Sequence, residues 1–445
     1  MSASPTPNIA IDWTRAYADL AADIRRLAAN ARPLVAGFAA CVDKRLDLHV
    51  VAPALAETTD PAAQHFLAEL LSRAKAGRGG EILVDWPEGP AFLDQFAGPD
   101  AASLGGTSAQ AAWTLARIGA PVVLALGDRS AGQLSVLDPG IRLTTADGRL
   151  QAPTECTPEP GGKLAHYILE YTAGRPLPGC VPARSTRIIV RFADEAVEHD
   201  ADFQAYIRGH AGQFGAGLLS SPNTVPLDQL GGVLDVLVAS VSDWRTAGID
   251  FIHWELGGFP WPGTRDLCIG RLAGHVSSIG LSLSELREVM GTDEPTDRQA
   301  LRLAMQCHIC RVVVHADEWA LAVTRGDAER ERRALMAGCL IAAARADRGL
   351  PIATPTVPRA GVFAPPPYPT AADLGDGWHM ASCASPYLRH PKSCLGLGDS
   401  FTAGTLLIHA QPMADAARQT GAAATEMQMP LPAGAPGNRS PSWLQ

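Results

Sequence analysis

Residues able to do chemistry gather near the end of the chain, in the run GLGDSFTAG at residues 396–404. Gly396 and Gly398 let backbone N–H groups approach an anion closely, and Asp399 follows at once. The small and apolar residues 401–410 predict a helix, whose N-terminus suits a phosphate. The Asp399 carboxylate could take a proton from a hydroxyl that attacks this phosphate. The alternative is an ordinary glycine turn with an aspartate N-cap.

Polar side chains also lie at or near the ends of three apolar runs that predict buried strands. Asp43 follows residues 34–42, Glu255 lies in the run 251–256, and His315 ends the run 312–315. Open α/β sheets bind ligands beyond the carboxyl ends of their parallel strands. A carboxylate such as Glu255 is costly to bury without a partner, and a metal ion is one candidate partner. For each of these residues a purely structural role, such as a cap or a satisfied buried histidine, is the alternative.

The elements around these residues predict an α/β architecture, because strand-like runs alternate with helical patterns. Apolar spacing indicates helices at 11–30, 61–76, 107–118, 284–290 and 327–346. Short apolar runs indicate strands at 81–85, 121–126, 233–241, 251–256, 276–279 and 312–315. Residues 351–369 are rich in proline and predict a connecting surface segment.

Residues 140–200 differ in pattern from the rest of the chain, which indicates two domains. Short β-like pieces at 141–145, 166–171 and 187–192 are separated by proline and glycine turns, which predicts a small β-rich lid without a core of its own. We assign residues 44–85 and 140–200 to this lid. Residues 1–43, 86–139 and 201–425 form the large α/β domain, and residues 430–445 a flexible tail.

Composition restricts the partners and the compartment. A formal charge of −9 argues against nucleic acid or an anionic membrane surface as main partner, but not against small phosphates. No apolar run approaches the roughly 18 residues of a membrane span, and the N-terminus resembles no secretion signal, so a cytoplasmic location is expected. The nine cysteines are scattered, which predicts reduced thiols rather than a zinc cluster at Cys307 and Cys310. The protein is expected to be a monomer or a small homo-oligomer.

Several pieces, in their order along the chain, resemble motifs of the ADP-dependent glucokinase/phosphofructokinase family, a branch of the ribokinase-like superfamily. They are GFAACVD at 37–43 (similar to GFNxNxD), LGGTSA at 104–109 (similar to MGG followed by Asn or Gln), AHYI at 165–168, HWEL at 253–256 (similar to HxE), SIGLSLSEL at 278–286 (similar to SVGLNExEL), VVHA at 313–316 and GLGDSFTAG at 396–404 (similar to GLGDTxxxG). The ordered set spans residues 34–410 and indicates a divergent member.

The resemblance implies a ribokinase-like three-layer α/β/α sandwich with a small β-rich lid, with a sugar bound between lid and sheet. Asp399 would be the general base, and the backbone of Gly396 and Gly398 the anion hole. His315 and Leu397 would lie on the nucleotide side.

By the same resemblance, Asp43, Gly105, Gly106 and His166 would contact the sugar. Glu81 lies where glucose-using members of the family keep a glutamate, which favours an acceptor without a phosphate.

The cofactor implied by the resemblance is Mg²⁺. Glu255, Glu285 and Asp399 would hold it, with Glu255 acting through water because Mg²⁺ keeps several of its waters.

Four residues depart from the family's motifs. Ala39 and Cys41 replace two asparagines, Thr107 replaces an amide, and Leu283 replaces the first glutamate of the metal motif. The motif that would carry catalysis is thus kept, whereas the motifs that would bind the sugar are changed. The first hypothesis is an ADP-dependent sugar kinase that makes AMP and a sugar phosphate. An ATP-dependent carbohydrate or nucleoside kinase, and a catalytically silent sugar- or nucleotide-binding homologue, are the alternatives.

Overall fold

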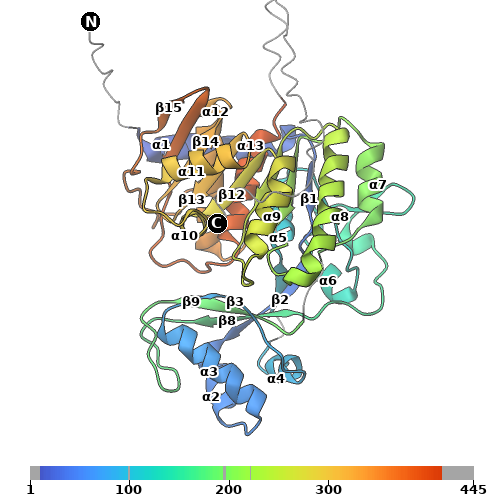
Figure 1. Cartoon of the computed structure of the whole chain (residues 1–445), viewed down its shortest axis with the longest axis vertical. Coiled ribbons are helices and arrows are strands. Elements are labelled where there is room, and N and C mark those ends of the chain that lie inside the picture. The colour runs from blue at the N-terminus through green and yellow to red at the C-terminus, as the bar shows by residue number, and fades with distance from the viewer. Residues whose placement is uncertain (1–10, 99–100, 194–196, 221, 413–445) are drawn as a thin grey trace, which may run out of the picture.

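The computed structural model describes residues 11–98, 101–193, 197–220 and 222–412. The predicted tail at 430–445 and the last residues assigned to the large domain, 413–425, lie outside these ranges. The chain forms a large α/β body and a smaller body, which lies below it in Figure 1. Within the described ranges no helix is both long and apolar enough to cross a lipid bilayer.

The large body is built on a sheet that has nine strands within the described residues. The strands, in spatial order, are β15 (Ala371–Gly375), β16 (Trp378–Ala384), β14 (Trp319–Thr324), β13 (Arg311–His315), β12 (Ser278–Ser282), β11 (Ile252–Glu255), β10 (Ala216–Ser220), β1 (Leu34–Gly37) and β5 (Val122–Leu124). From β5 to β13 all neighbours are parallel, whereas β14, β16 and β15 add in antiparallel pairs. The carboxyl ends of the parallel strands therefore meet at one edge.

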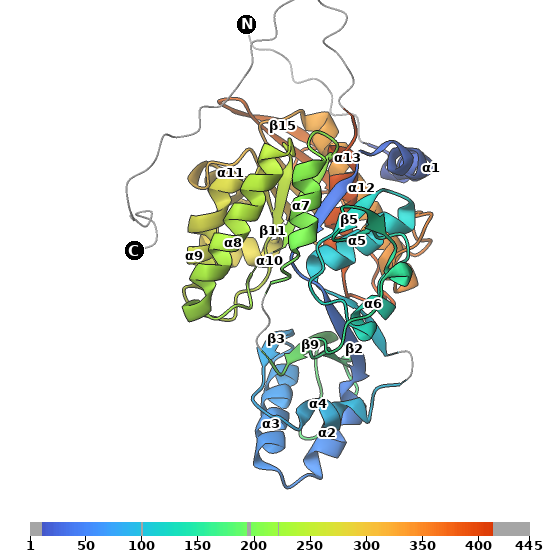
Figure 2. The same ribbon diagram turned by 90° about the vertical axis from the view of Figure 1, so that its right-hand side faces the viewer.

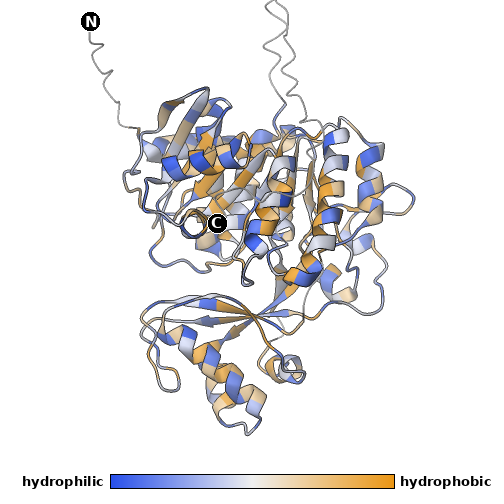
Figure 3. Ribbon diagram, viewed as in Figure 1, coloured by the Kyte–Doolittle hydropathy of each residue, from blue (hydrophilic) through white to orange (hydrophobic). Residues whose placement is uncertain are grey.

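Helices cover both faces of this sheet, as Figures 1 and 2 show. One face carries α7 (Ala201–Gly209), α8 (Leu227–Thr246), α9 (Thr264–Leu272), α10 (Leu283–Met290) and α11 (Thr296–Gln306). The other carries α1 (Trp13–Asn30), α5 (Thr107–Ile118), α12 (Ala328–Arg348) and α13 (Leu397–His409). Alternate strand residues serve the two cores, since Leu34 and Ala36 pack on the second face and Val35 on the first. The central strands of this sheet are largely hydrophobic in Figure 3, whereas the helices are mixed. The predicted three-layer sandwich is confirmed.

One predicted strand of the large body is wrong. Residues 233–241 lie inside helix α8, and the strand that precedes them is β10. The buried side chains of α8 include Leu230, Leu234, Leu237 and Val241, whose spacing of three and four is helical. The valine and leucine content of this run suggested a strand, but its period identifies the helix.

The smaller body has a five-stranded sheet of its own. Its strands, in spatial order, are β3 (Gly80–Leu83), β9 (Thr186–Arg191), β8 (His166–Tyr171), β2 (Cys41–Asp47) and β4 (Ala102–Gly105). Helices α2 (Leu48–Ala56), α3 (Pro61–Lys75) and α4 (Gly89–Asp94) pack on it around a buried cluster that includes Leu55, Phe66 and Tyr167. The expectation of a lid without a core is therefore wrong, because helices supply the second layer.

The domain boundaries differ from the predicted ones in two places. Helix α4 and strand β4 belong to the smaller body, because Trp86 and Leu93 join its core and β4 pairs with β2. Ile141 and Leu143 instead join the core of the large body. The remaining short elements are β6 (Leu143–Thr144), β7 (Leu150–Gln151), α6 (Ala131–Ser135) and the 3₁₀ turns η1 (Pro153–Glu155) and η2 (Ala273–His275).

The chain crosses between the two sheets where one strand was predicted. The apolar run 34–42 divides into β1 in the large sheet and β2 in the small sheet, with only residues 38–40 between them. A second crossing joins β4 to α5 through Gly106, whose φ is +87°. A Cβ there would lie 2.6 Å from the carbonyl oxygen of Ala39, so the two crossings touch and only glycine fits.

Candidate active site

A pocket of about 480 Å³ lies between the carboxyl ends of the large sheet's parallel strands and the small sheet. Residues at or just beyond the ends of β1, β10, β11, β12 and β13 line it, as does the turn before α13. The predicted site residues that line it are Asp43, Glu81, Gly106, His166, Glu255, Glu285, His315, Gly396, Leu397, Gly398 and Asp399. Gly105 does not line the pocket but lies beneath Asp43. Chemistry-bearing groups far apart in sequence thus share one cavity.

The glycine turn begins helix α13. Gly396 is its N-cap with φ of +69°, a left-handed conformation that glycine adopts without strain. The backbone N–H groups of Leu397, Gly398 and Asp399 donate no hydrogen bond to another backbone group of the described residues. Three backbone donors and the positive end of the helix dipole therefore point from the first turn, an arrangement that suits a phosphate.

Asp399 is a half-buried carboxylate in this first turn. Burial raises its pKa from 3.8 to about 6, and the nearby Glu255 raises it as well. The charge of Arg345 and a hydrogen bond with Thr107 act in the opposite direction. A carboxylate with a pKa near 6 is a better proton acceptor than an exposed aspartate and is still ionised at neutral pH.

Arg345 was not found by the sequence reasoning. It lies on α12, where its guanidinium donates to Ser400 Oγ (3.1 Å) and Gln110 Oε1 (2.6 Å). Burial lowers its pKa to about 10, so it stays charged behind the glycine turn. A Cβ on Gly396 would overlap the guanidinium. No local signal distinguishes this arginine from the other arginines of α12.

Glu255 ends β11 and is the centre of a buried polar group. Its Oε2 accepts hydrogen bonds from His253 Nε2 (2.9 Å) and Thr402 Oγ1 (2.9 Å), and its Oε1 from His315 Nε2 (3.3 Å). Burial alone would raise its pKa, but the bonds from His253 and His315 lower the pKa to about 2. Burial alone would lower the pKa of His315, but the hydrogen bond to Glu255 and the charge of Glu255 raise it. Glu255 is therefore an ionised carboxylate held by both oxygens.

Glu285 has a structural partner as well as a pocket position. It is the third residue of α10, and its Oε2 accepts from the backbone N–H of Ser282 at 2.7 Å, while Ser282 Oγ accepts from the Glu285 N–H. This reciprocal pair is a capping box. Burial raises the pKa of Glu285. Leu283 begins the helix and packs against the core of that face.

The acceptor side of the pocket belongs to the small sheet. Asp43 on β2 and His166 on β8 are direct neighbours in the ladder, with Asp43 Oδ1 3.8 Å from His166 Nδ1. Glu81 on β3 forms an ion pair with Arg191 at 3.0 Å. Arg187 also lines the pocket, and its Nε is buried without a hydrogen-bond partner among the described residues.

Together, an α/β sandwich, a cap sheet over its strand ends and a carboxylate at an anion-binding helix N-terminus define a small-molecule phosphotransferase with an alcohol as acceptor. A family model described as the ADP-specific phosphofructokinase/glucokinase conserved region matches residues 35–360. The chain therefore belongs to the ADP-specific phosphofructokinase/glucokinase family. The glycine turn at 396–404 lies beyond the matched range, so its assignment depends on the geometry given above.

Solved structures share this fold at low identity. An ADP-dependent kinase in complex with fructose-6-phosphate and ADPβS has 17% identity and a TM-score of 0.75, over 92% of this chain and 100% of that one. A phosphofructokinase from Pyrococcus horikoshii OT3 with AMP has 15% identity and a TM-score of 0.68, over 86% and 98%. The last common ancestor of ADP-dependent phosphofructokinases from Methanosarcinales has 17% identity and a TM-score of 0.66, over 90% and 98%. A search of curated protein sequences found no match.

Proposed function

We propose that this protein transfers the terminal phosphoryl group of ADP to a hydroxyl of a sugar or sugar-like small molecule, giving AMP and a sugar phosphate. One observation carries the proposal. The Asp399 carboxylate and the N–H groups of the first turn of α13 open into the same pocket as Asp43 and His166. Family membership favours ADP over ATP as donor.

In this proposal each side of the pocket has one task. Asp43, Gly106 and His166 orient the acceptor so that its hydroxyl lies beside Asp399. Asp399 takes the hydroxyl proton as the oxygen attacks the phosphorus, and the amides of Leu397 and Gly398 stabilise the charge on the transferring group. His315 and Leu397 lie on the nucleotide side. Closure of the smaller body over the pocket would exclude water, which would otherwise accept the phosphoryl group.

Mg²⁺ is the proposed cofactor, and the donors present fit it. Glu255, Glu285 and Asp399 supply only carboxylate oxygens, the ligands that Mg²⁺ prefers. Glu255 and Glu285 would hold the ion through water, because both oxygens of Glu255 and one of Glu285 already accept hydrogen bonds. When bound, Mg²⁺ neutralises charge on the nucleotide phosphates. Asp399 is the third proposed ligand of the ion. The cytoplasmic location and the oligomeric state, a monomer or a small homo-oligomer, stay predictions.

The rate should depend on the ionisation of Asp399. Its pKa is raised to about 6, and only the ionised form accepts a proton. We therefore expect kcat/KM to be level above pH 7 and to fall about tenfold per pH unit below pH 6. Initial rates between pH 5 and 8, with the melting temperature measured at each pH, test this. A level profile down to pH 5 in folded protein would contradict the base assignment.

Glu255→Gln should weaken the metal site. The change removes one negative charge and the ion pair with His315, and the loss of such a supporting group costs about 10–100-fold in metal affinity. The Mg²⁺ concentration at half-maximal rate should rise by this factor. Glu288→Gln, on the exposed side of α10, is the control. An unchanged Mg²⁺ dependence would rule out the role of Glu255.

The acceptor class is tested by a screen of sugars and nucleosides with ADP and with ATP, reading AMP and ADP separately. Two side chains bear on the choice of sugars. Glu81 favours an acceptor without a phosphate, whereas Arg187 offers a buried N–H to an acceptor that carries one. Each sugar is therefore assayed with and without a phosphate.

The screen has two informative outcomes. AMP formation that depends on an acceptor supports the proposal. Nucleotide binding without turnover on any compound would favour the catalytically silent homologue, which Leu283 and the replacement of two asparagines by Ala39 and Cys41 suggest.

A further inference from the structure

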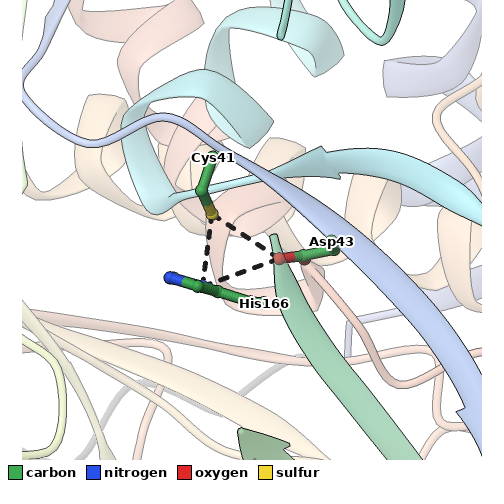
Figure 4. A group of neighbouring side chains, drawn as sticks. All are labelled: Cys41, Asp43 and His166. Atoms are coloured by element: carbon green, nitrogen blue, oxygen red, sulfur yellow. Dashed lines mark hydrogen bonds and ion pairs between the residues drawn. The ribbon is translucent and has the colours of Figure 1, made fainter. Parts of the chain in front are cut away.

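Three potential metal ligands meet in the small sheet. Cys41 Sγ lies 3.5 Å from Asp43 Oδ1 and 3.4 Å from His166 Nδ1, and the latter two atoms are 3.8 Å apart (Figure 4). Among the described residues, these form the one group of three such side chains with ligand atoms this close together. Cys41 and Asp43 are buried, and all three line the pocket.

The separations match those of a tetrahedral zinc site. Zn–S bonds of about 2.3 Å and Zn–N or Zn–O bonds of about 2.0–2.1 Å place sulfur roughly 3.5 Å from the other ligands, and nitrogen about 3.4 Å from oxygen. The three observed distances lie within about 0.5 Å of these values. Of the three distances, only that between Asp43 Oδ1 and His166 Nδ1, at 3.8 Å, exceeds the expected value.

The backbone holds these ligands on one face without any loop. Cys41 and Asp43 are two residues apart on β2, so their side chains lie on the same side of the sheet. His166 on β8 is the register partner of Asp43. On the other side of β2, Cys41 pairs with Gly105, and a Cβ there would overlap both Cys41 Sγ and Asp43 Oδ1. Gly105 thus leaves the space in which the three ligands meet.

We propose that Cys41, Asp43 and His166 form a zinc-binding site in this pocket. The thiolate and the carboxylate carry two negative charges, which Zn²⁺ neutralises, and the thiol proton is released on binding. Three protein ligands leave the fourth position for a water or a substrate oxygen. Lys163, which also lines the pocket, is ion-paired with Glu198, so its charge is compensated.

Zinc and the phosphoryl acceptor would use the same side chains. Asp43 and His166 are also the proposed acceptor contacts, so a bound zinc ion should inhibit the kinase competitively with the acceptor and not with the nucleotide. This kinetic consequence rests on the proposed function. The binding itself does not, because it needs neither nucleotide nor turnover.

The direct test is metal titration of the whole 445-residue chain after chelator treatment, with no nucleotide present. Co²⁺ is the first probe, because a cobalt–thiolate bond gives a charge-transfer band and tetrahedral cobalt gives visible bands. We expect one equivalent per chain, displaced by Zn²⁺. Cys41→Ser should abolish the thiolate band and weaken Zn²⁺ binding by about 100-fold or more, beyond the effect of losing an outer partner. Cys180→Ser, another thiol of the small body, should leave both unchanged.

Two further variants test the zinc site. His166→Gln retains the thiol and should still lose the tetrahedral spectrum, and melting temperatures report whether each variant is folded. Asp399→Asn should bind cobalt like the original chain, so failure of the kinase and failure of the zinc site are separable. Absence of a thiolate band, or a band that survives Cys41→Ser, would overturn the proposal.

Discussion

Asp399→Asn should reduce kcat by about 10²–10⁴-fold, the usual contribution of a positioned general base, while nucleotide affinity stays nearly unchanged. Asparagine keeps the size of the side chain but cannot accept the hydroxyl proton. Steady-state kinetics and nucleotide titration measure the two quantities.

The same substitution should also affect stability. Burial raises the pKa of Asp399, so the folded state disfavours its ionised form. The stability cost of this is absent at low pH and grows as pH rises towards 6. The variant should therefore melt no lower than the original chain at pH 8.

The control for this variant is Asp228→Asn. Asp228 also lies in the first turn of a helix, α8, but is exposed and does not line the pocket. Loss of activity in both variants would point to a general effect of helix-end charge. Activity of Asp399→Asn within a fewfold of the original chain would show that another group takes the proton.

Gly398→Ala should have the second largest effect, with little change in fold. An added Cβ would lie 3.4 Å from His315 Cε1, an ordinary contact, and Gly398 has a helical conformation that alanine favours. The methyl group would instead stand where a phosphate must approach the N–H groups of this turn. Loss of one such donor costs about 10²–10³ in kcat, and we expect a loss of that size. Rates and melting temperatures of the same preparation test both parts.

Gly232→Ala is the matched control for this change. It lies within helix α8, and nothing stands within 4 Å of a Cβ built there. Both variants should melt at or above the temperature of the original chain, but only Gly398→Ala should lose activity. Full activity of Gly398→Ala would mean that the phosphate does not approach the first turn of α13.

The fold could be predicted as far as local patterns define it. Residues 251–256 and 312–315 are short apolar runs, and β11 and β13 form there. Residues 233–241 are equally apolar and were wrongly predicted as a strand, because the helical period becomes visible only over the full length of α8. The transfer of residues 86–105 to the small body depends on pairing between β4 and β2, a long-range contact that no local pattern encodes.

The site could be predicted where motifs mark strand ends and glycine turns. Asp399, Glu255 and Asp43 follow such signals, and all three line the pocket. Arg345 carries no local signal, since its position depends on how α12 packs against α13. Cys41 was recognised as a departure from the family's pattern. Its nearness to His166 depends on the register between β2 and β8, which only the folded chain provides.

The contact between two of the chain's crossings, β1 to β2 and β4 to α5, has a mechanical consequence. Gly106 rests against the backbone of Ala39, whose carbonyl oxygen also accepts hydrogen bonds from Ser108 Oγ and the Ala109 N–H. These two crossings therefore act as one joint. The groups that choose the acceptor lie on one side of this joint, and the groups that activate the acceptor lie on the other. A tilt at this joint would alter selectivity and rate together without touching a reacting atom. Variants selected for a new acceptor should accordingly include changes at this joint as well as in the pocket wall.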